Sequence, residues 1–124
     1  MYGVFLLRNI LMQEKENTEL IEVVRELKAN GIQLILLSNI FLRNSDYFKN
    51  KYQFLQLFDK LYFSSDIGFI KPDPRAFEFV LKENDFKPEE CIFFDDSERN
   101  VAAAQALGIE SYIFEGASAV RQKV

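Results

Sequence analysis

Residues 91–100, with the sequence CIFFDDSERN, decide the fold of this chain. A short apolar run ends at two adjacent carboxylates, Asp95 and Asp96, and Ser97 follows as a residue type that favours helix N-caps. Small residues over 101–107 then favour a helix. The pattern predicts a buried strand, an acidic loop and a helix, with both aspartates at the carboxyl end of the strand, where open α/β sheets bind ligands.

The two adjacent carboxylates admit two interpretations. Neighbouring carboxylates repel unless a cation, a basic group or a proton lies between them, and oxygen ligands of this kind suit Mg²⁺. Alternatively, one aspartate caps the following helix and the other is solvated. The stretch by itself leaves both interpretations open.

The rest of the chain alternates predicted helices and strands. Apolar spacing predicts helices over 18–29, 75–83 and 101–107, and a two-piece, aromatic-rich helical segment over 41–58. Apolar runs predict strands over 32–37, 61–64, 92–94 and 111–114, whereas 65–68 is an expected loop and the tail from Gly116 has no clear signal. Asp73 is placed as a helix N-cap, with Pro74 as the first helical residue. This alternation predicts an α/β protein with a parallel sheet.

Composition bounds the class of protein. The chain has 124 residues, 48% of them hydrophobic and 27% charged, with a formal net charge of −4, which is typical of one soluble domain with a real core. No window is apolar enough for a membrane span, and an acidic chain without a basic cluster argues against nucleic acid as a partner. There is no histidine, which excludes a histidine base or metal ligand. The single cysteine, Cys91, fits a cytoplasmic setting.

Polar residues follow three of these segments where parallel strands would end. Ser38, Lys71 and the pair Asp95–Asp96 are expected at one edge of the sheet. A hydroxyl can donate to a phosphate oxygen, a lysine can neutralise its charge, and aspartates can hold Mg²⁺. Singly each signal is weak, because a serine after a strand is usually a turn residue and a lysine before proline is usually solvated.

In order and spacing, the three segments together resemble the haloacid dehalogenase superfamily of phosphatases, phosphonatases, mutases and dehalogenases. Residues 35–39 resemble its second motif, 65–74 its third and 93–100 its fourth, and the resemblance covers about 18–115. It implies a three-layer α/β/α sandwich with a parallel Rossmann-like sheet. The expected division is 1–17 as a cap-helix remnant or degenerate first strand, 18–115 as the core and 116–124 as a tail.

The resemblance also implies roles for individual residues. Phosphate would be contacted by Ser38, Asn39 and Lys71, and Lys71 would be catalytic because it bridges nucleophile and phosphate. Mg²⁺ would be bound by Asp96 and Asp95, directly or through water. These groups would be supported by Ser97 and Asn100.

The chain departs from the family pattern at the first motif. It is an Asp-x-Asp whose first aspartate is the nucleophile and whose second is the general acid/base, yet this chain has no aspartate before Asp46. In one interpretation the chain is a fragment: residues 2–12 are the last helix of a cap domain, and the central strand is missing. In the other, residues 4–11 are a degenerate first strand and motif, with Leu6 at the position of the nucleophile and Arg8 at that of the acid/base.

The two interpretations carry different expectations. Intact later motifs favour the fragment, which is the preferred interpretation. A missing central strand would lead to homo-oligomerisation or segment exchange. A closed sheet favours the degenerate member, in which Arg8 pairs with the acidic pair in place of Mg²⁺. Leaving buried strand groups unpaired would cost about 1 to 3 kcal/mol each, which makes the fragment marginal.

The functional hypothesis is a Mg²⁺-dependent hydrolase of a small phosphorylated metabolite, catalytically silent as this chain because the nucleophile is absent. One alternative is a non-catalytic binding or interaction protein that buries exposed phenylalanines, such as Phe41, Phe48 or Phe54, against a partner. The other alternative is a haloacid dehalogenase, which the intact acidic pair disfavours.

Overall fold

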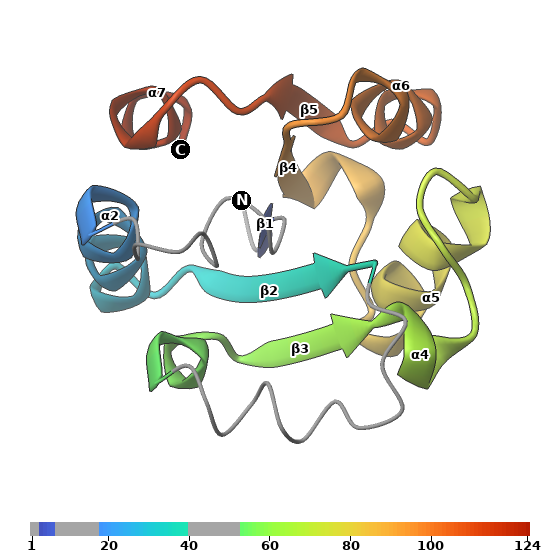
Figure 1. Cartoon of the computed structure of the whole chain (residues 1–124), viewed down its shortest axis with the longest axis horizontal. Helices are drawn as coiled ribbons and strands as arrows, with labels where there is room; N and C mark the ends of the chain where they lie inside the picture. The colour runs from blue at the N-terminus through green and yellow to red at the C-terminus, as the bar shows by residue number, and fades with distance from the viewer. Residues whose placement is uncertain (1–2, 7–17, 40–52) are drawn as a thin grey trace.

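A computed structural model describes residues 3–6, 18–39 and 53–124 of the chain. Five parallel strands form one sheet in the order β3-β2-β1-β4-β5 (Figure 1). The strands are β1 (Gly3–Leu6), β2 (Gln33–Ser38), β3 (Lys60–Phe63), β4 (Cys91–Asp95) and β5 (Glu110–Ile113). The helices are α2 (Thr18–Ala29), α4 (Ser64–Ile67), α5 (Pro74–Glu83), α6 (Glu98–Ala106) and α7 (Ala117–Lys123), with short 3₁₀ turns at η1 (Gln53–Leu57) and η2 (Pro88–Glu90). The predicted α/β class is confirmed.

Strand β1 occupies the centre of the sheet. Its Leu6 is in register with Leu36 of β2, and its Phe5 is in register with both Ile35 of β2 and Phe93 of β4. The expected cap helix over residues 2–12 is therefore wrong for Gly3–Leu6, and the expected gap between β2 and β4 is filled. The physical reason is that β1 supplies hydrogen-bond partners to the facing edges of both neighbours, groups that would otherwise be buried unpaired.

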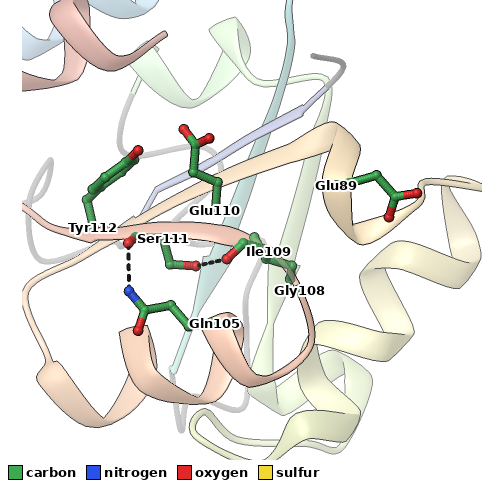
Figure 2. Close-up of a pocket in the computed structure, with 7 residues that line it drawn as sticks. All are labelled: Glu89, Gln105, Gly108, Ile109, Glu110, Ser111 and Tyr112. Atoms are coloured by element: carbon green, nitrogen blue, oxygen red, sulfur yellow. Dashed lines mark hydrogen bonds between the residues drawn. The ribbon is translucent and has the colours of Figure 1, made fainter.

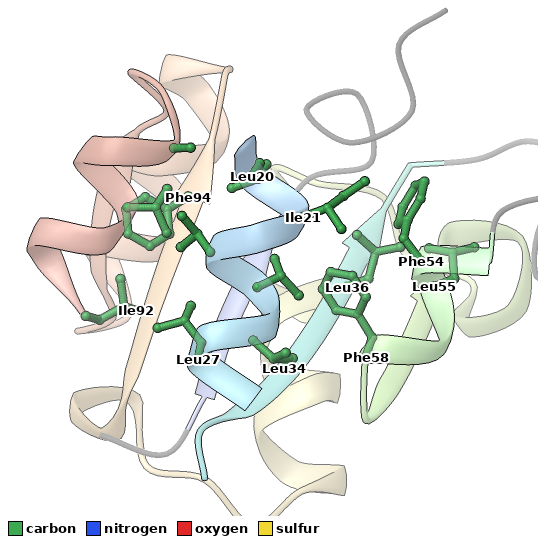
Figure 3. Close-up of a cluster of buried hydrophobic side chains, with 14 of the residues drawn as sticks. Leu20, Ile21, Leu27, Leu34, Leu36, Phe54, Leu55, Phe58, Ile92 and Phe94 are labelled. Atoms are coloured by element: carbon green, nitrogen blue, oxygen red, sulfur yellow. The ribbon is translucent and has the colours of Figure 1, made fainter. Parts of the chain in front are cut away.

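Two helical layers cover the sheet. On one face, α2, α7 and η1 enclose a core that includes Leu34, Leu36 and Phe94 (Figure 3). On the other, α5 and α6 pack over Ile35 and Leu37. Alternate residues of β2 thus enter opposite cores, as the period of a strand requires. The continuous apolar run of this strand reflects a sheet buried on both faces, which is typical of parallel sheets.

Side-chain caps begin the two helices that follow the site segments. Asp73 accepts a hydrogen bond from the Arg75 backbone N–H at 2.9 Å, with Pro74 in the first turn of α5. Ser97 accepts from the Asn100 backbone N–H at 3.4 Å and begins α6. Both predicted caps are confirmed. They fix where the preceding loops end, and those loops carry the polar residues of the site.

Several local predictions were wrong or lie outside the described residues. The loop expected at 65–68 is largely the short helix α4, and the tail forms α7, whose Val120 is fully buried against the α2 face. Phe54 is only 6% exposed, so it is not available to a partner, while Phe41 and Phe48 lie outside the described residues. Of the expected helical segment 41–58, the described part is a 3₁₀ turn. Among the described helices, none has the length and apolar character needed to cross a membrane.

Candidate functional site

The predicted polar residues meet at the carboxyl edge of the sheet. Strands β2 and β4 end there at Ser38 and Asp95, and the arrowhead of β2 points toward the side where α4 and α5 lie (Figure 1). Lys71 reaches the same edge from the segment between α4 and α5. The sequence-based expectation that these groups converge is consistent with their contacts.

Lys71 is buried among acceptors. Its Nζ donates to the Leu37 carbonyl oxygen at 2.8 Å and to Asp95 Oδ2 at 3.1 Å, and it lies 5.6 Å from the centroid of the Phe93 ring. The side chains of Lys71 and Asp95 are both 0% exposed. An ion pair shielded from water in this way is strongly coupled, because neither charge can be left alone without a large desolvation penalty.

Asp95 is held on both of its carboxylate oxygens. Oδ1 accepts from the Ser97 backbone N–H at 2.8 Å, and Oδ2 accepts from Asn100 Nδ2 at 3.1 Å in addition to Lys71. The start of α6 therefore supplies two donors to this carboxylate. Ser97 and Asn100 lie where the resemblance expects supporting residues, around the first aspartate of the pair.

Asp96 differs from its neighbour in that its side chain reaches solvent. Partial desolvation raises the pKa of Asp96 above its ordinary value of 3.8, and the hydrogen bond and negative charge of Asp95 raise it further, against a lowering effect of Lys71. A carboxylate destabilised by a negative neighbour is a natural ligand for a cation. The two predicted metal ligands thus have different surroundings, one enclosed and one accessible.

The donor set limits how a magnesium ion could bind. Within residues 3–6, 18–39 and 53–124, no group of three or more His, Cys, Asp or Glu side chains could hold a metal ion. Both oxygens of Asp95 already accept protein hydrogen bonds. Mg²⁺ commonly keeps several waters and takes one or two carboxylates together with phosphate oxygens. Asp96 fits an ion of this kind, held jointly with a phosphate ligand.

Within the described part of the chain, Ser38 Oγ is the one buried side-chain nitrogen or oxygen atom that has no hydrogen-bond partner. The residue is 1% exposed, and its Oγ has no hydrogen-bond partner. It directly follows Leu37, whose carbonyl oxygen accepts from Lys71 Nζ. A buried hydroxyl without a partner is unusual in a folded protein and indicates a ligand or water position.

Asn39 has a role that the sequence did not reveal. Its side-chain Oδ1 accepts from the Lys71 backbone N–H and its Nδ2 donates to the Lys71 carbonyl oxygen, both at 3.0 Å. The amide is therefore committed to the main chain of Lys71, and the predicted phosphate contact of Asn39 remains a prediction. No spacing in the sequence signals this pairing, because the two residues are 32 positions apart.

At the centre of the same edge stands Leu6. It ends β1 beside Leu36 of β2, in the position that the second interpretation assigned to the nucleophile. Arg8 lies outside the described residues. A leucine has no nucleophilic atom, so position 6 itself cannot supply a carboxylate nucleophile.

A separate hollow of about 490 Å³ lies along β5 (Figure 2). Its lining is Glu89, Gln105, Gly108, Ile109, Glu110, Ser111 and Tyr112. Its polar groups are partly satisfied within the chain, since Gln105 Nε2 donates to the Ser111 carbonyl oxygen at 3.0 Å and Ser111 Oγ donates to the Ile109 carbonyl oxygen at 2.8 Å. The hollow contains none of the residues that converge around Lys71, so it is distinct from the candidate site.

The fold and the converging lysine and aspartates define a Rossmann-like α/β protein with a candidate site at the carboxyl edge of the sheet. The chain belongs to the haloacid dehalogenase-like hydrolases, whose family model matches residues 2–108. That match includes β1 and all the segments that resembled the family in sequence.

Characterised relatives include phosphatases. The chain is 34% identical over 95 residues to a sesquiterpene phosphatase of Aspergillus oryzae, covering 77% of this chain and 48% of the relative. It is 36% identical over 66 residues to a D-ribitol-5-phosphate phosphatase of Bacteroides thetaiotaomicron, covering 53% and 32% respectively. The chain spans about half, or less, of the length of these relatives.

Solved structures agree with the fold. A haloacid dehalogenase family enzyme of Bacteroides thetaiotaomicron, in complex with magnesium and inorganic phosphate, matches with a TM-score of 0.69 and 29% identity, covering 81% of this chain and 53% of that one. An uncharacterised protein of Corynebacterium glutamicum matches with a TM-score of 0.84 and 21% identity, covering 99% and 91%. The second likeness shows the fold alone.

Proposed function

We propose that this chain is a phosphate-binding domain of the Mg²⁺-dependent phosphatase type that binds a small phosphorylated molecule and does not hydrolyse it. The observation that carries the proposal is the buried, unpartnered hydroxyl of Ser38, the residue after Leu37, whose carbonyl oxygen accepts from the enclosed ammonium of Lys71. A hydroxyl donor next to a positive charge is a suitable pair for a phosphate oxygen. The phosphatases among its relatives, and the neighbour that binds magnesium and phosphate, support the ligand class.

Charge around the site supports a role for a divalent cation. Among the residues that the structure describes at the site, Lys71 contributes one positive charge, whereas Asp95 and Asp96 contribute two negative charges. A phosphate dianion would increase this excess of negative charge unless a cation binds with it. In the proposal Asp96 holds Mg²⁺, and the ion, when bound, supplies charge neutralisation for the phosphate. Ion and phosphate should therefore bind more tightly together than separately.

The absence of hydrolysis follows from the residues at the first-motif positions. Leu6 ends β1, where the interpretation as a degenerate member places the nucleophile, and the sequence has arginine at position 8, where that interpretation places the acid/base. Neither side chain can form and release a phosphoryl intermediate at neutral pH. In the proposal Ser38 and Lys71 would bind the phosphate, and Asp95 would hold the Lys71 ammonium in place, without any of them attacking phosphorus.

Burial of the site predicts modest affinity. Ser38 and Lys71 are at most 2% exposed, so a phosphate reaches them only when the site opens. The observed affinity is reduced by the fraction of molecules that are open. We therefore expect phosphate binding to be weak, and to be detected more readily by changes in NMR signals than by a high affinity.

A serine-to-alanine comparison tests the proposal. Inorganic phosphate, with and without Mg²⁺, is titrated into the purified chain while the amide signals of Lys71 and Asp96 are followed by NMR. Ser38→Ala should weaken phosphate binding about tenfold, the range of one hydrogen bond to a charged group, and leave unfolding unchanged or slightly harder because the hydroxyl has no partner to lose. Ser111→Ala, at a buried serine outside the site, should leave phosphate binding unchanged.

Two outcomes would contradict the proposal. If phosphate with Mg²⁺ shifts none of these signals, or if Ser38→Ala binds as the parent does, the site does not take phosphate in the manner proposed. If the purified chain hydrolyses p-nitrophenyl phosphate and Lys71→Ala abolishes the turnover, the proposed lack of catalysis is wrong.

A further inference from the structure

Asn39 and Lys71 form a side-chain-to-main-chain pair across two segments. One amide group satisfies both the N–H and the C=O of a single residue, each at 3.0 Å. Residues of adjacent antiparallel strands exchange hydrogen bonds in the same double manner. Asn39 directly follows β2, and its side-chain amide bonds to the Lys71 main chain in the way that a neighbouring strand residue would.

The segment that receives this support has little regular structure of its own. Residues 68–73 connect α4 to α5, and within it the Asp73 backbone N–H donates to the Ile70 carbonyl oxygen at 2.8 Å. A lysine side chain is a flexible four-carbon stem, so its ammonium is placed accurately only if its main chain is fixed. The ammonium of Lys71 must meet both the Leu37 carbonyl oxygen and Asp95.

From this geometry we infer that Asn39 is a positioning residue, whose amide fixes the Lys71 main chain and so keeps the Lys71 ammonium in the closed site. It acts through Lys71, because both polar atoms of its side chain bond to the Lys71 main chain. The consequence for phosphate binding rests on the proposed function, but the positioning of Lys71 does not. The two parts can therefore fail separately.

The test must separate positioning from a general structural role. Asn84 provides a matched control, because it is also half-buried and its side-chain amide also makes two hydrogen bonds. Both are donated by Nδ2, to Tyr62 Oη at 2.9 Å and to the Val80 carbonyl oxygen at 2.8 Å. Asn84 follows α5, at the end remote from Lys71 in sequence. Loss of its bonds should lower stability without releasing Lys71.

Chemical acylation of lysine, read by mass spectrometry, reports directly on the Lys71 ammonium. In the parent chain Lys71 should be protected relative to the exposed Lys87. Asn39→Ala should raise the Lys71 rate about tenfold, the order expected for losing two hydrogen bonds. Asn39→Asp keeps the acceptor for the Lys71 N–H but loses the donor to its carbonyl oxygen, and should give an intermediate rate. Asn84→Ala should leave Lys71 as protected as in the parent.

The outcomes decide both parts. If Lys71 is acylated no faster in folded Asn39→Ala than in Asn84→Ala, the positioning role is refuted. If Asn39→Ala does not fold, the acylation rate of Lys71 in folded Asn39→Asp is compared with that in Asn84→Ala, and an equal rate refutes the role. Titration with inorganic phosphate and Mg²⁺ follows. If the parent binds phosphate, Asn39→Ala should bind about tenfold more weakly, and unchanged binding refutes the link to the site. If the parent binds none, the proposed function fails while the labelling result stands.

Discussion

Replacing Lys71 by methionine removes one charge of a fully buried pair. Lys71 Nζ and Asp95 Oδ2 lie 3.1 Å apart, and both side chains are 0% exposed. Methionine fills most of the same volume, so the main change is electrostatic. The carboxylate of Asp95 stays in the interior, where its remaining donors among the described residues are the Ser97 backbone N–H and Asn100 Nδ2.

The magnitude follows from these contacts. Removing one partner of a buried ion pair typically destabilises a protein by about 3 to 5 kcal/mol. Because two donors remain on Asp95, we expect the lower end, about 3 kcal/mol. For a domain of this size that corresponds to a fall in Tm of roughly 10 °C. The double variant Lys71→Met/Asp95→Asn removes both charges and should recover much of the loss, since Asn100 can rotate its amide to suit the new neighbour.

Urea unfolding followed by circular dichroism measures both variants. The slope of the free energy of unfolding against urea should stay constant while the midpoint moves, which indicates a change in stability alone. The reasoning is refuted if Lys71→Met lies within about 1 kcal/mol of the parent, well below the range for a broken buried pair. It is equally refuted if the double variant is no more stable than the single one, because the loss would then not arise from an unpaired buried charge.

Three further predictions concern other parts of the molecule. The pKa of Asp96 is raised in the folded chain, so the stability that its neutral form contributes is present below the ordinary pKa of 3.8 and is lost as pH rises through the folded pKa. Asp96→Asn should therefore raise Tm at neutral pH and leave Tm unchanged near pH 3. An equal gain in Tm at both pH values would contradict this reasoning. Val120→Ala should cost about 2 kcal/mol in urea unfolding because Val120 is fully buried, whereas the exposed Ser118→Ala should change little; similar losses would mean that α7 is not packed as described. Leu6→Asp with Arg8→Asp should give measurable Mg²⁺-dependent hydrolysis of p-nitrophenyl phosphate, and Leu6→Asn with Arg8→Asp, which lacks the nucleophile, should give none; equal rates would contradict the role of position 6.

Much of the fold was predictable because its signals are local. The apolar face of α2, the continuous apolar run of β2 and the caps Asp73 and Ser97 depend on residues within a few positions of one another. β1 was harder, because a run of four apolar residues fits one turn of a helix as well as a strand. Only pairing with β2 and β4, which are distant in sequence, decides between the two.

The site was predictable in location but not in detail. Strand ends placed Ser38 and the acidic pair at one edge, which Lys71 reaches from the segment between α4 and α5. The sequence does not say which aspartate is enclosed, since that depends on donors at the start of α6 and from Lys71. The amide of Asn39 and its pairing with Lys71 were missed for the same reason. The helix α7 was also missed, because seven residues have too little intrinsic helicity and the helix is stabilised by packing against α2.

The central position of β1 has a consequence for biosynthesis. β1 leaves the ribosome before either neighbour, and its second partner is complete only when Asp95 has been added, 95 − 3 = 92 residues after Gly3. At a typical rate of about 5 to 20 residues per second, this strand waits roughly 5 to 20 seconds with an open edge. An apolar strand exposed for that time is a natural target for a chaperone, so the yield of folded protein should depend on translation speed and chaperone supply more than its small size suggests.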